Sequence, residues 1–205
     1  MADHIIRDLA ALEALYGQVN DVSALKEITY LHPHYAAFIK ASPFAILATA
    51  GPHGLDASPR GDAPGFVQIV DDKTLLLADR RGNNRIDSLR NILSDPHVAL
   101  LFLVPGVGET LRVNGIAEIS ADPDLLARFT VHDKAPRSML VIHIESVFFQ
   151  CSRALIRSEL WNPERHLPRT NLPSTGQILA AVTHDRIDAQ TYDRELPPRL
   201  KATLY

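Results

Sequence analysis

The sequence has one cysteine and no long apolar run, and these two features exclude several classes of protein. Cys151 is the only cysteine in 205 residues, so the chain cannot form an internal disulfide or a zinc site built from several cysteines. The longest apolar run, Val98 to Val104, stops at Pro105, far short of the ~20 residues that a membrane-spanning helix needs. Charged residues interrupt the first turns of the chain, which is unlike a secretory signal. We therefore expect a cytoplasmic protein.

The chain also lacks an excess of charge of either sign. Its 21 Lys and Arg stand against 24 Asp and Glu, which gives a formal net charge of −3. This near balance excludes a generally basic chain that binds nucleic acid. A length of 205 residues, with 46% hydrophobic and 22% charged residues, fits a single globular domain with a full-sized core.

Common catalytic and cofactor motifs are missing as well. There is no Walker loop, and the segment 106–108 lacks the third glycine of a dinucleotide fingerprint. His32 and His34 stand two apart without further metal-ligand spacing, so we predict no metal site. Cys151 follows an apolar run, and we interpret it as a buried thiol; the alternative is a nucleophile with His143 as its base. The sequence therefore identifies no catalytic residue through a known motif.

Short apolar runs separated by turn residues predict a series of strands. They cover 44–49, 55–60, 66–70, 73–78, 98–104, 110–119 and 139–151. We expect the first four to form an antiparallel meander, and 98–104 to form a hairpin with 110–119 across a Pro-Gly-Val-Gly turn. In 110–119, Leu111 and Val113 alternate with Arg112 and Asn114, which is typical of a half-buried strand.

Helical patterns stand at both ends of the chain. Apolar residues recur at helical spacing before Gly17, a second helix is expected over 33–41, and Asp122-Pro123 starts a third. Ser174 and Gln177 form a capping box at the start of two short helices packed on the barrel or on a partner subunit.

Taken together, these strands and helices predict a mainly β fold class, an antiparallel β-barrel or sandwich with added helices. Within this single structural domain we separate N-terminal helices (1–42), the barrel (43–161), and a connector with C-terminal helices (162–205).

The segment 79–90 holds the strongest functional signal. An amphipathic helix is expected to end before Pro96, with its apolar face formed by Ile86, Leu89 and Leu93. Three arginines gather at its start, although the positive end of a helix normally attracts acids: Arg80, Arg81 and Arg85. Together with Gly82 and the free backbone N–H groups they predict a phosphate site. The alternative is a solvated basic loop in which Asp79 and Asp87 pair with the arginines.

A second cluster, Ser58-Pro59-Arg60-Gly61-Asp62, ends one of the predicted strands. Arg60 stands just before a glycine turn. It either reaches a bound anion or serves as an ordinary charge on an edge strand. Trp161, the single tryptophan, either covers a ligand or anchors the core or an interface.

The order of these pieces resembles the pyridoxamine 5′-phosphate oxidase-related flavoproteins. The matching segments span about 40–165 of the chain and are 58–62, Gly82-Asn83-Asn84-Arg85, Leu89-Arg90-Asn91, Asp95-Pro96 and 110–115. The late stretches Phe149-Gln150-Cys151 and 157–161 look like one subgroup of that superfamily, the "oxidase-like, FMN-binding" proteins.

This resemblance implies an FMN-binding split barrel that forms a homodimer, with FMN in a cleft between the subunits. It implies that Arg85 holds the FMN phosphate next to Asn83, and that Arg80, Arg81 and Gly82 line the same turn. It further implies that Ser58 and Arg60 lie on a strand that faces the cofactor. Thr110 is expected to face the flavin from the partner subunit, and Gln150 is a further candidate on the late strand.

The resemblance implies an FMN-dependent oxidoreductase with a small-molecule substrate. The vitamin B6 oxidases carry an Arg-Leu-His-Asp-Arg signature near their ends, where this chain has Arg199-Leu200-Lys201-Ala202-Thr203, so pyridoxamine phosphate oxidation does not follow. The alternatives are a non-catalytic flavin carrier or redox sensor, and a split barrel that binds heme or the deazaflavin F420. We expect neither a nucleic acid nor a membrane as a partner.

Overall fold

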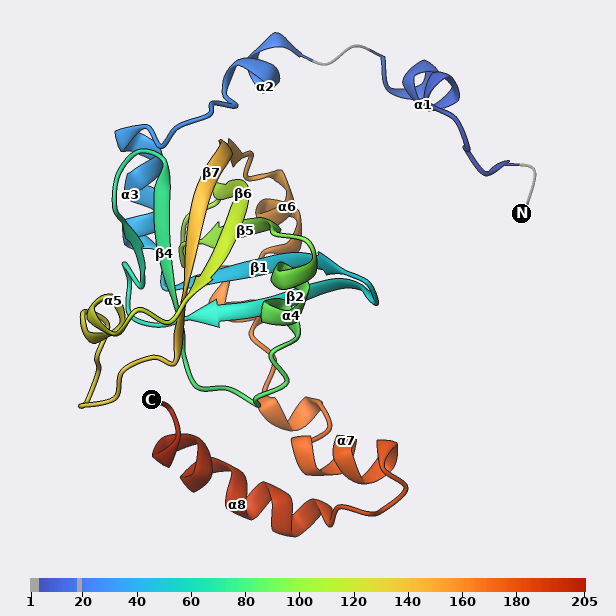
Figure 1. Ribbon diagram of the computed structural model, residues 1–205. Coiled ribbons are helices and arrows are strands. Elements are labelled where there is room, and N and C mark those ends of the chain that lie inside the picture. Colours follow the sequence, from blue (N-terminus) through green and yellow to red (C-terminus); the bar gives the residue numbers. More distant parts are fainter. Residues whose placement is uncertain (1–3, 18–19) are drawn as a thin grey trace.

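The computed structural model describes residues 4–17 and 20–205. Its centre is a seven-stranded antiparallel sheet in the order β2-β1-β5-β6-β7-β4-β3, which curls into a half-barrel (Figure 1). The strands are β1 (Phe44–Gly51), β2 (Gly54–Gly61), β3 (Val67–Ile69), β4 (Thr74–Asp79), β5 (His97–Leu103), β6 (Thr110–Ser120) and β7 (Ser138–Gln150). This architecture confirms the predicted mainly β fold, a split barrel with added helices.

Helices surround the sheet and extend beyond it. They are α1 (Leu9–Tyr16), α2 (Asp21–Leu25), α3 (Pro33–Ala41), α4 (Asp87–Ser94), α5 (Pro123–Ala127), α6 (Arg153–Ser158), α7 (Thr175–Val182) and α8 (Ala189–Ala202), with 3-10 turns η2 (Pro163–Arg165) and η3 (Arg169–Asn171) in the connector. The predicted helix at 33–41 is confirmed, as is the capping box at Ser174. In the described part of the chain, every helix is too short or too polar to cross a lipid bilayer.

The predicted meander of the first four strands is wrong. β1 pairs with β2, and β3 pairs with β4, but β2 and β3 lie at opposite edges of the sheet. The chain leaves β2 at Gly61 and enters β3 at the opposite edge of the sheet. Local turn signals identify hairpins well, whereas the pairing of one hairpin with another depends on contacts that are distant in sequence.

The core lies on the concave face of the sheet. Along β1, Ala45, Leu47 and Thr49 point inward and are buried, while the residues between them are half-buried or exposed, the two-residue period of a strand. Phe102 of β5 and Leu111 of β6 are fully buried in the same cluster. Helix α3 closes one end of this core by packing on β3, β5, β6 and β7.

Helix α4 packs on the other end of the core through a face that differs from the prediction. Leu93 is 79% exposed and Ile86 is 47% exposed, whereas Ser88 and Ile92 are buried. A serine points inward because its hydroxyl has partners in the sheet below. Leu89, the third residue of the predicted apolar face, is partly buried against the core, so the prediction is right for Leu89 and wrong for Ile86 and Leu93.

The structure also decides the surroundings of Cys151 and Trp161, the two single residues whose roles the sequence left open. The Cys151 thiol is exposed, so its interpretation as a buried thiol is wrong; β7 ends at Gln150, and the residue after it leaves the sheet. Trp161 donates a hydrogen bond from Nε1 to the carbonyl oxygen of Val107 over 2.8 Å, and so fixes the start of the connector to the β5–β6 turn.

The C-terminal helices form a hairpin below the sheet (Figure 1). α7 and α8 pack on each other, and the approach is close because Gly176 has no side chain: a Cβ there would lie 2.2 Å from the Ala189 carbonyl oxygen. The Gly176 N–H donates to the Asp193 carboxylate. After α8 the chain turns back towards the loop between α5 and β7, where Tyr205 lies.

Candidate functional site

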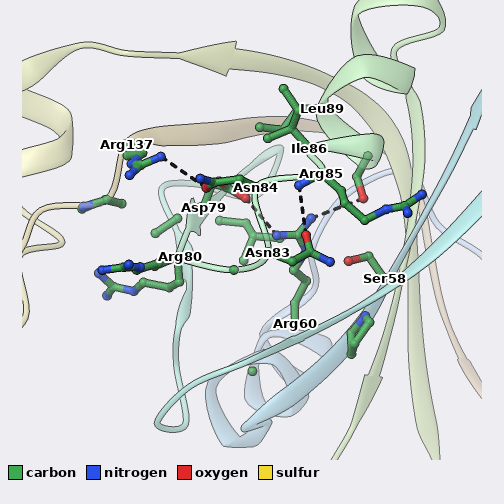
Figure 2. A pocket seen from close by; sticks show the side chains of 18 of the residues that line it. Ser58, Arg60, Asp79, Arg80, Asn83, Asn84, Arg85, Ile86, Leu89 and Arg137 are labelled. Carbon is green, nitrogen blue, oxygen red and sulfur yellow. Dashed lines mark hydrogen bonds and ion pairs between the residues drawn. The ribbon is translucent and has the colours of Figure 1, made fainter. Parts of the chain in front are cut away.

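A pocket of about 830 Å³ opens beside the carboxyl half of β2. Its walls come from β2, the turn 79–86 with the first residues of α4, the loop 134–137, and Tyr205. Figure 2 shows the side chains that converge there. The volume lies within the range of about 300–1,000 Å³ that small-molecule and cofactor sites occupy.

Strand β2 forms the floor of the pocket with one face. Asp56, Ser58 and Arg60 are two residues apart, so their side chains point to the same side of the strand, and each is partly buried. Ser88 of α4 reaches this floor: its hydroxyl donates to Asp56 over 2.6 Å and accepts from Arg60 Nη2 over 3.3 Å. Arg60 Nη1 also pairs with Asp79 at 2.9 Å. This network joins β2, β4 and α4 beneath the pocket.

One donor in that network has no partner. Arg60 Nε is buried and forms no hydrogen bond within the described residues. Buried polar atoms in folded proteins nearly always have a partner, so each exception calls for an explanation. A ligand acceptor above Arg60 would supply one.

The turn before α4 is strained. Asn84 and Ile86 both have positive φ, 60° and 53°; Asn tolerates this conformation, but for a β-branched residue it is a true outlier that costs about 1–3 kcal/mol. Ile86 is also the N-cap, where it provides no capping side chain. The first helical hydrogen bond is donated by the Arg90 N–H. The preceding N–H groups of the first turn therefore have no intrahelical acceptor.

The arginines around this turn differ in how far they are engaged. Arg85 is exposed and its Nε donates to Asp87 over 2.7 Å; the hydrogen bond and the charge of Asp87 raise the pKa of its guanidinium. Arg80 is more buried, with Nε on Asp62 at 3.2 Å and Nη1 on the Phe129 carbonyl oxygen at 2.7 Å. Arg81 is exposed. Arg80 therefore stabilises the fold by bonding to residues distant in sequence, while Arg81 and Arg85 face solvent.

Positive side chains outnumber negative ones in the pocket lining. The cations are Arg60, Arg80, Arg81, Arg85, Lys134 and Arg137, against Asp56, Asp79 and Asp87. In a chain whose net charge is negative, this local excess favours an anionic ligand. Arg137 Nη1 donates to the Asn84 side-chain oxygen over 3.3 Å and so supports the strained turn from the opposite wall.

Comparison with known proteins identifies the family of this chain. The sequence model of the pyridoxamine 5′-phosphate oxidase family matches residues 31–151, more than half of the chain. The chain belongs to the pyridoxamine 5′-phosphate oxidase family. The matched range contains all seven strands and the whole turn 79–86 before α4. No curated protein matched the chain.

Several solved structures are similar to this family member. HupZ from Group A Streptococcus is 21% identical, with a TM-score of 0.49 over 60% of this chain and 95% of that one. General Stress Protein 26 from Bacillus anthracis is 17% identical, with a TM-score of 0.43 over 56% and 88%. A protein of Clostridium acetobutylicum related to general stress protein 26 is 13% identical, with a TM-score of 0.45 over 58% and 86%.

Most residues expected at the site of this family member lie together. The pocket is lined by Ser58, Arg60, Arg80, Arg81, Gly82, Asn83 and Arg85. Asn83 orders the turn, since its side-chain oxygen accepts from the Arg85 N–H over 3.0 Å. Thr110 and Gln150 pair with each other at 3.5 Å and do not line this pocket in one subunit. Their expected contact with a flavin, from a partner subunit in the case of Thr110, stays a prediction.

Sequence reasoning missed several residues of the pocket. Asp56 shares the two-residue period of Ser58 and Arg60, so extending the strand pattern by one step would have identified it. Ser88 carries no signal of its own, because serine in a first helical turn usually caps the helix or faces solvent. The loop 134–137 and Tyr205 carry no local signal and reach the pocket only through the fold.

Proposed function

We propose that this protein is an FMN-dependent oxidoreductase that acts on a small-molecule substrate. The observation that carries the proposal is the uncapped, strained start of α4, which opens into a cation-rich pocket. A helix N-terminus with free N–H groups binds a phosphate well, and the Asn83–Arg85 turn adds guanidinium and amide donors beside it. Family membership favours FMN as the phosphate-bearing ligand.

The residues divide the binding of FMN between them. Arg85 and Arg81 neutralise the phosphate, and the first-turn N–H groups of α4 donate hydrogen bonds to it. Arg60, which has a free Nε on the floor, donates to an acceptor of the cofactor. Bound FMN would supply the transfer of hydride or electrons, and the protein would supply orientation and electrostatics.

The pocket offers no free acid or base for further chemistry. Asp56 accepts from Ser88, Asp79 pairs with Arg60, and Asp87 pairs with Arg85. Among the residues that the structure describes, those that line the pocket include no histidine and no cysteine. This observation favours chemistry carried by the cofactor, and it equally fits a second candidate, a flavin carrier or redox sensor without turnover.

The proposal includes a homodimer with FMN at the subunit interface, to which Thr110 of the neighbouring subunit contributes, with Gln150 as a further candidate. We place the protein in the cytoplasm, because an exposed free thiol such as Cys151 persists best in a reducing compartment.

The visible absorption spectrum of the purified protein is the first test. Two flavin bands, with FMN released on heat denaturation and identified by chromatography, would support the cofactor assignment. A colourless protein that also fails to bind added FMN would remove it. Adding NADH or NADPH under air then separates the two candidates, because an oxidoreductase bleaches and reoxidises repeatedly, whereas a carrier does not.

A further inference from the structure

The end of the C-terminal hairpin contacts the rim of the pocket through one residue. Tyr205 donates a hydrogen bond from its hydroxyl to Asp62 over 2.7 Å. Its ring lies 5.6 Å from the Arg80 guanidinium and 5.5 Å, edge to face, from the His132 ring. Its main-chain oxygen accepts from Lys134 Nζ over 2.7 Å. These partners come from the loop after β2, the turn after β4, and the loop before β7.

The rest of the α7–α8 hairpin is stabilised by contacts between its own two helices. α8 buries no residue, and the single buried residue of α7 is Gly176, which faces α8. Among the described residues, each hydrogen bond that joins 175–205 to the chain before residue 160 is made by Tyr205. The hairpin is thus linked to the barrel by the connector at one end and by Tyr205 at the other.

Tyr205 is also part of the pocket wall. Asp62 accepts from its hydroxyl and Arg80 lies over its ring; these two residues lie next to β2 and to the turn that leads to α4. We propose that Tyr205 is an anchor that docks the α7–α8 hairpin against the pocket and limits the rate at which the pocket exchanges its ligand. For FMN as that ligand, the inference rests on the proposed function.

The charges around Tyr205 favour the docked state near neutral pH. Burial tends to raise the pKa of the Asp62 carboxyl, but hydrogen bonds from Tyr205 and the Ala63 N–H, with the Arg80 charge, outweigh it and hold the pKa below its ordinary value. The hydrogen bond to Asp62 raises the pKa of the Tyr205 hydroxyl. An ionised Asp62 and a protonated Tyr205 are therefore both favoured by docking, with His132 and Lys134 as the other titratable neighbours.

The test compares Tyr205→Ala and Tyr205→Phe with Leu204→Ala, a control at the adjacent exposed position. Hydrogen exchange of the segments 62–66 and 129–137 reports docking without any ligand. Stopped-flow flavin fluorescence gives the association and release rates of FMN. We expect Tyr205→Ala to speed exchange in both segments and to raise both FMN rates at least threefold, because an undocked hairpin opens the pocket in both directions. Tyr205→Phe keeps the ring on Arg80 and should fall between, and Leu204→Ala should match the wild type.

Each other outcome has a definite meaning. Unchanged hydrogen exchange and unchanged rates in Tyr205→Ala overturn the inference. Faster release with unchanged association and exchange also overturns it, since Tyr205 would then be a simple wall contact. A wild-type protein that binds no FMN overturns the proposed function and the claim about FMN, while hydrogen exchange still decides whether Tyr205 docks the hairpin.

Discussion

Arg85 is an exposed residue immediately before the N-cap of α4, and its Asp87 partner is only partly buried. An exposed ion pair of this kind adds little to folding, about 0–1 kcal/mol, which leaves the side chain available to a ligand. We expect Arg85→Ala to lower FMN affinity at least tenfold, because a charge-assisted hydrogen bond contributes about 1.5–3 kcal/mol. Arg90→Ala, an exposed arginine on the same helix that does not line the pocket, is the control. Equal FMN titrations for wild type and Arg85→Ala would contradict the phosphate assignment.

Ile86 stores strain at the same helix end. It adopts a left-handed conformation as N-cap and is 47% exposed, so little burial is lost when it is replaced. Asn adopts this conformation readily and is a preferred N-cap, worth about 1 kcal/mol. We expect Ile86→Asn to raise the free energy of unfolding of the ligand-free protein by about 1 kcal/mol in urea melts, and to weaken FMN binding because the amide would compete for the N–H groups. Leu93→Asn, on the exposed side of α4, should give no such gain.

At the scale of elements, the longest strand pair has a built-in irregularity. β6 and β7 shift register between Asn114 and Gly115, and a Cβ on Gly115 would lie 2.2 Å from the His143 main-chain oxygen. Backbone cannot move aside as a side chain can. We expect Gly115→Ala to destabilise the protein by about 3 kcal/mol or more, at the upper end of single substitutions. Gly82→Ala, with open space around it, should change the melting midpoint little. A mild effect at Gly115 would show that the bulge is adjustable.

The elements that sequence predicted best are those defined by neighbouring residues. The hairpin of β5 and β6, helix α3 and the Asp122 cap of α5 follow from alternation, proline position and capping, which act within a few residues. The order of strands does not follow in this way, because β1 pairs with β5 and β4 pairs with β7, and these partners are distant in sequence. Short helices without a strong apolar face, such as α2 and α6, gave no signal and were missed.

The difference between local signals and long-range contacts also explains how much of the candidate site could be predicted from the sequence. Arg80 to Arg85 form one continuous segment, so their gathering could be read directly from the sequence. Their individual roles could not, because Arg80 turns to Asp62 and Phe129, which are distant along the chain. Ser88 and Tyr205 depend on two elements meeting in space, and no pattern of nearby residues encodes that meeting.

For the whole molecule, the described part of the chain leaves apolar surface without a cover. A shallow groove of about 230 Å³ runs over the outer face of β1, β5 and β6, with Ile46, Leu101 and Arg112 in one cross-strand row. An antiparallel sheet with one solvated face usually alternates apolar with polar residues, yet Ile46 and Ala48 both point outward. Helices α1 and α2 extend away from the barrel (Figure 1) and bury no residue.

This uncovered face leads us to a prediction about the oligomeric state of the protein. If the outer face of β1, β5 and β6 is the homodimer interface, burial of a leucine there contributes about 1.5–3 kcal/mol, and a charge would oppose it strongly. We expect light scattering to show a wild-type dimer, and Leu101→Glu to shift the mass towards one chain with loss of bound FMN, since the cofactor would lie between the subunits. Leu167→Glu, at an exposed connector position, should leave both unchanged. A monomeric wild type would contradict the dimer, whereas a monomeric Leu101→Glu protein that retains FMN would place the whole flavin site within one subunit.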